Sequence, residues 1–242
     1  MKWSTVVMMI AMALDVTPTV RGQAPAGGMS APERIAAVKQ NLQESQARLR
    51  QYEWIETTII SLKGEEKAHK QNRCYYGADG KVQKIPIGGE PQQQQAQSGG
   101  GRRGGRVKQK IVENKKNEMQ EYMERASNLI KLYVPPDPQK IQAAKGAGRL
   151  VPSASAGRAR VEIRDYLQPG DTLAFDLDAV ANTLQGVGVA TYLEKPEDTV
   201  TLDVRYATMP DGTNYSAQTT LEAKAKNIRV VVENSGYRPM GR

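Results

Sequence analysis

Residues that supply catalytic and metal-binding chemistry are scarce in this chain. It has one His and one Cys among 242 residues, and aromatic residues make up only 5% of it. A single Cys excludes an internal disulfide, and one His with one Cys cannot build a transition-metal site or a nucleophile–base pair. The sequence contains neither a phosphate-binding loop nor a Gly-x-Ser-x-Gly motif. We therefore expect a protein that is not an enzyme and that needs no metal or cofactor.

Long apolar runs are also rare, and the first one is short. A single Lys precedes the run Trp3–Leu14, which has the length of the apolar region of a secretory signal and is too short to span a bilayer. This pattern predicts a signal peptide over residues 1–24, with cleavage after Gly22 or after Ala24. The alternative is a buried helix of the mature protein. Residues 25–242 are expected to form a single exported domain, either periplasmic or secreted.

Acidic residues are outnumbered, and the formal net charge is +8. Much of the excess lies in one segment, where the positive residues are Arg102, Arg103, Arg106, Lys108 and Lys110. Residues 88–106 are rich in Gln, Gly and Arg and contain no large apolar residue, so they cannot bury enough surface to offset the entropy of ordering. We expect a disordered insertion there. Contact of Arg102, Arg103 and Arg106 with an anionic surface is the functional alternative, and nucleic acid is not an expected partner because stacking aromatics are absent nearby.

Two amphipathic helices are predicted. Ser30 and Glu33 have the spacing of a capping box at a helix start. Apolar residues then recur every three or four positions up to Tyr52, which is the period of one helix face. A second stripe of this kind runs from Val112 to Tyr133.

The other periodic segments alternate between apolar and polar residues, which is typical of an antiparallel sheet with one solvated face. The predicted strands are 52–62, 69–76, 81–87, 160–166, 173–178, 184–193, 200–206, 215–224 and 228–233. A short helix near 139–145 and a loose stretch through Gly157 precede the last six of them. The sequence thus predicts an α+β fold, in which a strongly curved antiparallel β-sheet forms a half-open barrel covered by the two amphipathic helices.

Isolated reactive groups are interpreted as structural. Asp176, Asp178 and Asp203 alternate with apolar residues and should face water, with a calcium site or an acid–base pair as the alternative. Cys74 alternates within a strand and is interpreted as a small buried side chain. His69 is expected to be exposed.

The order of helix, strands, second helix and long meander is similar to that of the periplasmic lipoprotein carriers and receptors of the Lol system, the LolA-like and LolB-like proteins. The resemblance covers residues 31–237 and includes the turn Pro210-Asp-Gly-Thr-Asn-Tyr215 and the closing run 226–237. It implies a half-open barrel with a helical lid that holds acyl chains, and a function related to the sorting of outer-membrane lipoproteins.

A carrier of this kind would bury a lipid or lipoprotein acyl chain against the concave face of its sheet. The candidate apolar lining consists of Trp54, Ile60, Leu173, Phe175, Leu177, Leu202, Val204 and Tyr206, and the candidate lid residues are Met119 and Met123. If the helices cover this face completely, the same residues are ordinary core. A second hypothesis is an exported interaction module that docks an envelope protein or polymer through the outer face of its sheet or its basic loop, with peripheral membrane contact as a further option.

Overall fold

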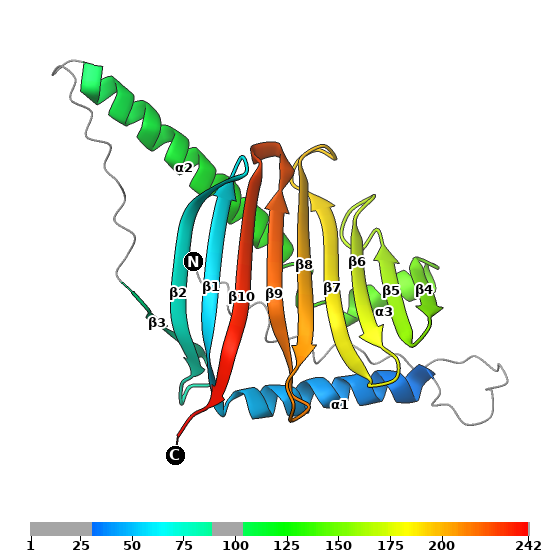
Figure 1. Ribbon diagram of the computed structural model, residues 1–242. Coiled ribbons are helices and arrows are strands. Elements are labelled where there is room, and N and C mark those ends of the chain that lie inside the picture. The colour runs from blue at the N-terminus through cyan, green and yellow to red at the C-terminus, as the bar shows by residue number, and fades with distance from the viewer. Residues whose placement is uncertain (1–30, 89–103, 242) are drawn as a thin grey trace.

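A computed structural model describes residues 31–88 and 104–241, and a single antiparallel sheet dominates it (Figure 1). The strands are β1 (Tyr52–Leu62), β2 (Glu65–Tyr76), β3 (Val82–Pro86), β4 (Leu150–Ser155), β5 (Arg158–Arg164), β6 (Thr172–Asp178), β7 (Thr183–Tyr192), β8 (Thr199–Thr208), β9 (Asn214–Ala223) and β10 (Ile228–Pro239). Their order in the sheet is β3-β2-β1-β10-β9-β8-β7-β6-β5-β4. From β4 to β10, each strand therefore pairs with the next one in the chain.

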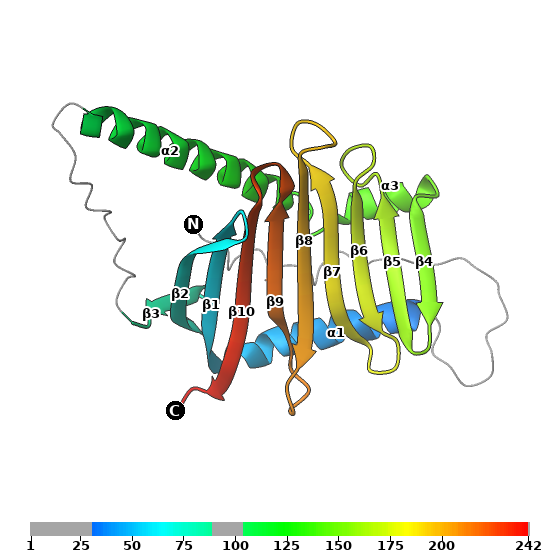
Figure 2. The same ribbon diagram turned by 45° about the horizontal axis from the view of Figure 1, so that its top comes forward.

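The first three strands join this meander at its far end. β1 pairs with β2 on one side and with β10 on the other, so early and late parts of the chain meet in adjacent strands. β3 and β4 remain at the two edges, and the sheet curves without closing (Figure 2). This architecture confirms the predicted fold class, an α+β protein with a half-open antiparallel sheet.

In the described part of the chain, three α-helices accompany the sheet: the two amphipathic helices predicted as its cover and the short helix predicted near 139–145. α1 (Ala31–Leu49) lies across the sheet and contacts β1, β7 and β9. α3 (Pro138–Gly146) packs against β5. The last turns of α2 (Gly104–Ile130) bury Tyr122, Ala126 and Ile130. The first half of α2 extends away from the sheet in both views (Figures 1 and 2).

The largest differences between the predicted and the observed boundaries are at α2, β2, β4 and β10, and β10 runs to Pro239 and not to 233. α2 begins at Gly104 and not near Val112, because an apolar stripe marks only those turns of a helix that pack against the rest of a protein. β2 begins at Glu65, immediately after a tight turn. β4 occupies the stretch before Gly157 that was expected to be loose. The last four residues of β4 are exposed, so the segment lacks the alternation of apolar and polar residues that would predict a strand.

Two predicted segments lie mostly or wholly outside the described residues. The signal peptide at 1–24 is one of them. The insertion at 88–106 is the other, and only its ends, residue 88 and the helical residues 104–106, are described. Both assignments, and the division into a signal and one domain, remain predictions.

The core lies where the inner face of the middle strands meets the helices. Its fully buried side chains include Leu173 from β6, Val187 from β7 and Leu221 from β9, together with Ile130 of α2 and Tyr133 of the turn that follows it. Complete burial of one such aliphatic side chain stabilises the fold by about 1.5–3 kcal/mol. The middle of the sheet is therefore stabilised by apolar packing against the helices.

The isolated reactive groups lie as predicted where the structure describes them. Cys74 is fully buried, and burial together with the nearby Glu56 carboxylate raises the pKa of its thiol to about 12. His69 is exposed and lies 3.4 Å from the carboxylate of Glu66. Neither side chain has the environment of a catalytic nucleophile or base.

The three aspartates singled out as calcium or acid–base candidates serve other contacts. Asp176 and Asp203 form exposed ion pairs with Arg160 and Arg205, and Asp178 accepts hydrogen bonds from backbone N–H groups in the turn that follows β6. Within residues 31–88 and 104–241, no group of three or more His, Cys, Asp or Glu side chains is placed to hold a metal ion. The described helices also include none with the length and apolar character needed to cross a membrane.

Candidate functional site

A pocket of about 410 Å³ opens on the concave side of the sheet, between strands β1, β2, β8, β9 and β10 and the ends of helices α1 and α2. One wall is apolar. It is formed by Leu42 and Leu49 of α1, Met123 and Ile130 of α2, Val134, Ile60 of β1, Leu202 and Val204 of β8, and Val230 and Val232 of β10. Alternation along the strands explains this wall, because every second residue of β8 and β10 points to the same face.

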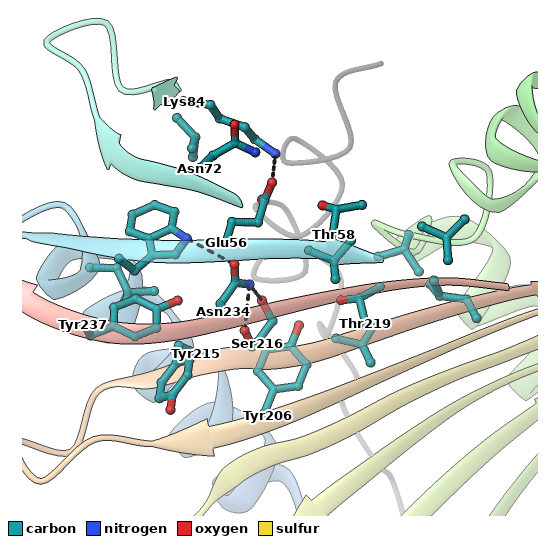
Figure 3. A pocket seen from close by; sticks show the side chains of 18 of the residues that line it. Glu56, Thr58, Asn72, Lys84, Tyr206, Tyr215, Ser216, Thr219, Asn234 and Tyr237 are labelled. Carbon is teal, nitrogen blue, oxygen red and sulfur yellow. Dashed lines mark hydrogen bonds and ion pairs between the residues drawn. The ribbon is translucent and has the colours of Figure 1, made fainter. Parts of the chain in front are cut away.

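The opposite end of the pocket is polar and lies near β1, β2 and β3. Glu56 of β1 and Lys84 of β3 form an ion pair there (Figure 3). The Glu56 side chain is 8% exposed and that of Lys84 is 27% exposed, so the ammonium group lies nearer to solvent. Thr58, Lys70 and Asn72 line the same end. A charged pair that is this well buried needs its partner, because an isolated carboxylate in such a position is costly.

An aromatic cluster closes the pocket beside the ion pair. The ring of Tyr237 stacks on Trp54 with centroids 5.6 Å apart, and it lies 4.5 Å from the ring of Tyr215. The ring of Tyr76 also packs against Trp54, with centroids 5.5 Å apart and planes tilted by 48°. Gly236 adopts a φ of 62° next to Tyr237, a left-handed conformation that a side chain would resist. The register of β1 against β10 shifts at the same level.

Hydrogen bonds hold this cluster in place. The indole N–H of Trp54 donates to Oδ1 of Asn234 at 3.1 Å, and Nδ2 of Asn234 donates to the backbone carbonyl of Ser216 at 3.0 Å (Figure 3). One side chain thus links β1, β10 and β9 at the floor of the pocket. Trp54 is consequently oriented as well as buried, and its ring forms a fixed wall.

Several polar groups at the pocket have no hydrogen-bond partner within residues 31–88 and 104–241. Burial raises the pKa of the Tyr206 hydroxyl, and burial with the neighbouring Tyr76 and Tyr215 hydroxyls raises that of Tyr237. Neither hydroxyl has a hydrogen-bond partner among the described residues. Oδ1 of Asn214 is buried and also unpaired there. Such groups are usually satisfied by water or by a ligand.

The C-terminal end of α1 is fastened to the turn between β8 and β9. Ser45 Oγ accepts a hydrogen bond from the backbone N–H of Asn214 at 2.9 Å. Nε of Arg48 donates to Oγ1 of Thr213 at 2.9 Å. Ser45 and Thr213 are both buried. These bonds fix Leu42 and Leu49 of α1 against the pocket.

The structure brings together five of the eight predicted lining residues. Trp54, Ile60, Leu202, Val204 and Tyr206 line the pocket. The other three, Leu173, Phe175 and Leu177 of β6, pack in or against the core cluster and are not pocket residues. Alternation identifies which face of a strand points inward, but not which part of that face a helix covers, and this explains the difference.

The other predicted contact residues fall in different places. Met123 lines the pocket, whereas Met119 is partly buried against the core cluster. Arg102 and Arg103 lie outside the described residues, and Arg106 belongs to the first turns of α2, where side chains are not described. The role of the two methionines as a lid and the contact of the three arginines with an anionic surface remain predictions.

Sequence reasoning missed the polar end of the pocket. A signal was present in β1, because Glu56 and Thr58 have the same parity as Trp54 and Ile60 and must share their face. A Glu in an otherwise inward-facing series indicates either a buried ion pair or a ligand contact. The position of Lys84 carried no such signal, because β3 is short and mostly exposed.

No protein-family model matches the chain, and no curated protein sequence matches it significantly. Two solved structures align with most of it. A LolA superfamily protein from Nitrosomonas europaea is 8% identical with a TM-score of 0.36, and the alignment covers 85% of this chain and 94% of that protein. A DUF1329 family protein from Desulfovibrio piger is 11% identical with a TM-score of 0.34, covering 84% and 93%. The first of these belongs to the superfamily that the order of elements resembles, and similarity at this level does not carry function from one chain to another.

Proposed function

We propose that this chain is an exported, non-enzymatic binding protein that holds an apolar chain of a lipid or lipoprotein in the pocket of its concave face. One observation carries the proposal. The pocket of about 410 Å³ has a continuous apolar wall built from two helices and three strands. Ligand pockets of proteins commonly measure roughly 300–1,000 Å³ and are lined mainly by apolar side chains with a few polar groups.

The energetics of an acyl chain suit such a wall. Each methylene that leaves water contributes about 0.8 kcal/mol, so a single chain supplies useful affinity without polar recognition. Met123 adds an adaptable side chain at the α2 side of the pocket, and a thioether side chain can adjust to chains of different shape.

The same face of the sheet supports both core and ligand. β6 and β7 fill the space beneath α1 and α3 with Leu173, Val187 and Val189. In the other half of the sheet, inward residues of β1, β8 and β10 line the pocket. The half of the sheet that includes β6 and β7 therefore packs the core, and the half that includes β1 and β2 is available for binding.

A pocket-filling substitution tests the proposal. Thr58 points into the pocket from β1 (Figure 3), and Thr58→Trp would place a large ring in the space for the chain. We expect the affinity for N-phenylnaphthylamine, an uncharged fluorescent apolar probe, to fall about tenfold or more, since the wall is then occupied. The wild-type protein, purified from cells, should also release stoichiometric lipid into organic solvent, as measured by mass spectrometry.

The matched control lies one residue away. Thr57 points to the opposite face of the same strand, where its hydroxyl accepts a hydrogen bond from Gln71, so Thr57→Trp makes the same change outside the pocket. It should leave probe affinity unchanged. Equal affinity of both variants, or a wild-type protein that binds no probe and releases no lipid, contradicts the proposed function.

A further inference from the structure

We propose that the ligand is a single-chain amphiphile with an anionic head, a carboxylate or a phosphate, and that Lys84 and Lys70 at the β1–β3 end of the pocket bind this head. The inference rests on the proposed function and specifies its ligand. The juxtaposition that carries it is a charged, partly solvated end joined to an apolar wall within one pocket.

Positive charges outnumber negative charges at this end of the pocket. Glu56 is the acidic residue among those that line the pocket, and Lys84 already neutralises it. Lys70 lines the same end and forms no ion pair with any described residue. An anion arriving here therefore meets uncompensated positive charge, whereas a cation would meet a carboxylate that is paired and almost fully buried.

The register of the strands places the two lysines on either side of one amide. Lys70 and Asn72 are successive inward residues of β2, and Glu56 lies opposite Asn72 on β1. Lys84 reaches from β3 across to Glu56 (Figure 3). Lys84 lies opposite Cys74, the inward residue of β2 that follows Asn72, so along β2 the position of Asn72 falls between those of the two lysines, and its amide can donate to the same anion.

The ion pair orients Lys84 and leaves some of its hydrogen-bond donors available. An ammonium group has three N–H donors, and the bond to Glu56 uses one of them. Because Glu56 is the more deeply buried partner, it holds the ammonium group at the pocket surface in one orientation. Hydrogen bonds from such a preoriented cation to an anion are among the stronger polar contacts in proteins.

Exposure and size define the rest of the ligand. The lysine end is the more solvated one, with Lys84 27% exposed, so a charged head remains near water while its chain enters toward Val230, Val232 and Ile130. A volume of about 410 Å³ lies near the lower end of the range for ligand pockets. It suits one chain, and it is small for the several chains of a diacyl lipid or a triacylated protein.

The test compares heads on a constant chain. Dodecanoate, dodecyl phosphate and dodecanol, each below its critical micelle concentration, compete with N-phenylnaphthylamine for the full mature chain. We expect both anions to bind about tenfold more tightly than the alcohol, and the tighter of the two identifies the head as carboxylate or phosphate. The preference should weaken as salt is added, because the site is partly solvated.

Substitutions at the two lysines test where the head binds. Lys70→Gln, and the double change Glu56→Gln with Lys84→Gln, should bring the ratio of anion affinity to dodecanol affinity, measured on the same variant, close to one. The double change avoids leaving a buried carboxylate unpaired. Lys84→Arg keeps the charge and should keep the preference. Lys195→Gln, at an exposed position in the turn after β7, makes the same charge change elsewhere and should have no effect.

The results separate a failure of this inference from a failure of the proposed function. Equal binding of all three compounds to the wild-type protein, or an anion preference that survives both lysine variants, overturns the anionic head and leaves chain binding intact. Failure of all three compounds to displace the probe, with no binding of the probe itself, overturns the proposed function together with this inference.

Discussion

At the scale of single residues, Asp171 is the clearest case of a polar side chain on which local structure depends. It is 1% exposed and accepts hydrogen bonds from the Tyr133 hydroxyl at 2.5 Å and from the backbone N–H groups of Tyr166, Leu167 and Gln168. Asp171→Ala removes the acceptor of the three backbone N–H groups and leaves the Tyr133 hydroxyl with Thr191 Oγ1 as its partner. We expect the free energy of unfolding to fall by about 3 kcal/mol or more, measured by urea denaturation.

Asp176→Ala provides the comparison for Asp171. Asp176 pairs with Arg160 on the exposed face of β5 and β6, and a solvated pair of this kind contributes roughly 0–1 kcal/mol. A loss of similar size in the two variants would contradict the assignment of Asp171 as the organising group of this turn.

The same contrast explains which residues sequence patterns reveal. Alternation placed Leu202 and Val204 on the inner face, and they line the pocket, because period-two burial depends only on neighbours along one strand. The role of Asp171 depends on Tyr133, which is far away in the sequence. Glu56 on β1 and Lys84 on β3 are likewise far apart along the chain, and β2 lies between their strands in the sheet. Their ion pair therefore follows from the order of the strands and not from either local segment.

At the scale of elements, the β1–β2 hairpin is closed by a two-residue turn with an unfavourable first residue. Lys63 and Gly64 both have positive φ angles, 53° and 81°, as the turns preferred by hairpins require. Gly accepts this conformation at no steric cost, whereas Lys is strained in it. Lys63→Asn should therefore stabilise the protein by about 0.5 kcal/mol, and Gly64→Val should destabilise it by about 1 kcal/mol or more.

Thermal unfolding of the two variants checks this prediction, with Lys195→Asn as the control in a different turn. Lys195 is exposed and does not have a positive φ, so the same exchange should change the midpoint little. A lower midpoint for Lys63→Asn would show that the Lys63 side chain, and not its backbone angle, matters at this turn.

Most elements could be predicted because their residues carry their own periodicity. The strands β1 and β6 to β9 begin and end within a few residues of the predicted segments. β4 could not be predicted, since it pairs only with β5 and has Pro152 in its middle, and Pro is tolerated there because an edge strand leaves one side unpaired. The start of α2 could not be predicted, because the apolar stripe begins only at Val112 and the first turns of the helix extend away from the sheet (Figure 1).

At the scale of the whole molecule, the decisive feature is the pairing of β1 with β10. Nearly all of both strands takes part, from Tyr52 opposite Pro239 to Leu62 opposite Ile228. This contact brings β1, β2 and β3 beside the end of the meander and so creates the pocket, with its apolar and charged ends. The residues of neither strand specify its partner. The sequence information on this pairing came from the order of the elements, which is similar to the order found in half-open barrels.

The distribution of charge over the whole molecule separates the binding hypothesis from the docking hypothesis. Arg102, Arg103 and Arg106 precede or begin α2, whose first half extends away from the sheet (Figure 2). Electrostatic interactions across water are screened over about 8 Å at physiological ionic strength. Neutralising these arginines to Gln should therefore change the affinity of the pocket for dodecanoate by less than about twofold. It should also weaken sedimentation with phosphatidylglycerol vesicles if the segment contacts anionic lipid.

A triple change of Arg158, Arg205 and Arg229 to Gln is the matched control, because these exposed residues carry the same charge at other places on the surface. Two results would be decisive against this division of roles. Loss of dodecanoate binding in the first variant alone would assign the basic segment to the pocket. Equal vesicle binding by the wild-type protein and the first variant would mean that the arginines do not contact anionic lipid, because removal of three contacting charges must reduce the attraction at low salt.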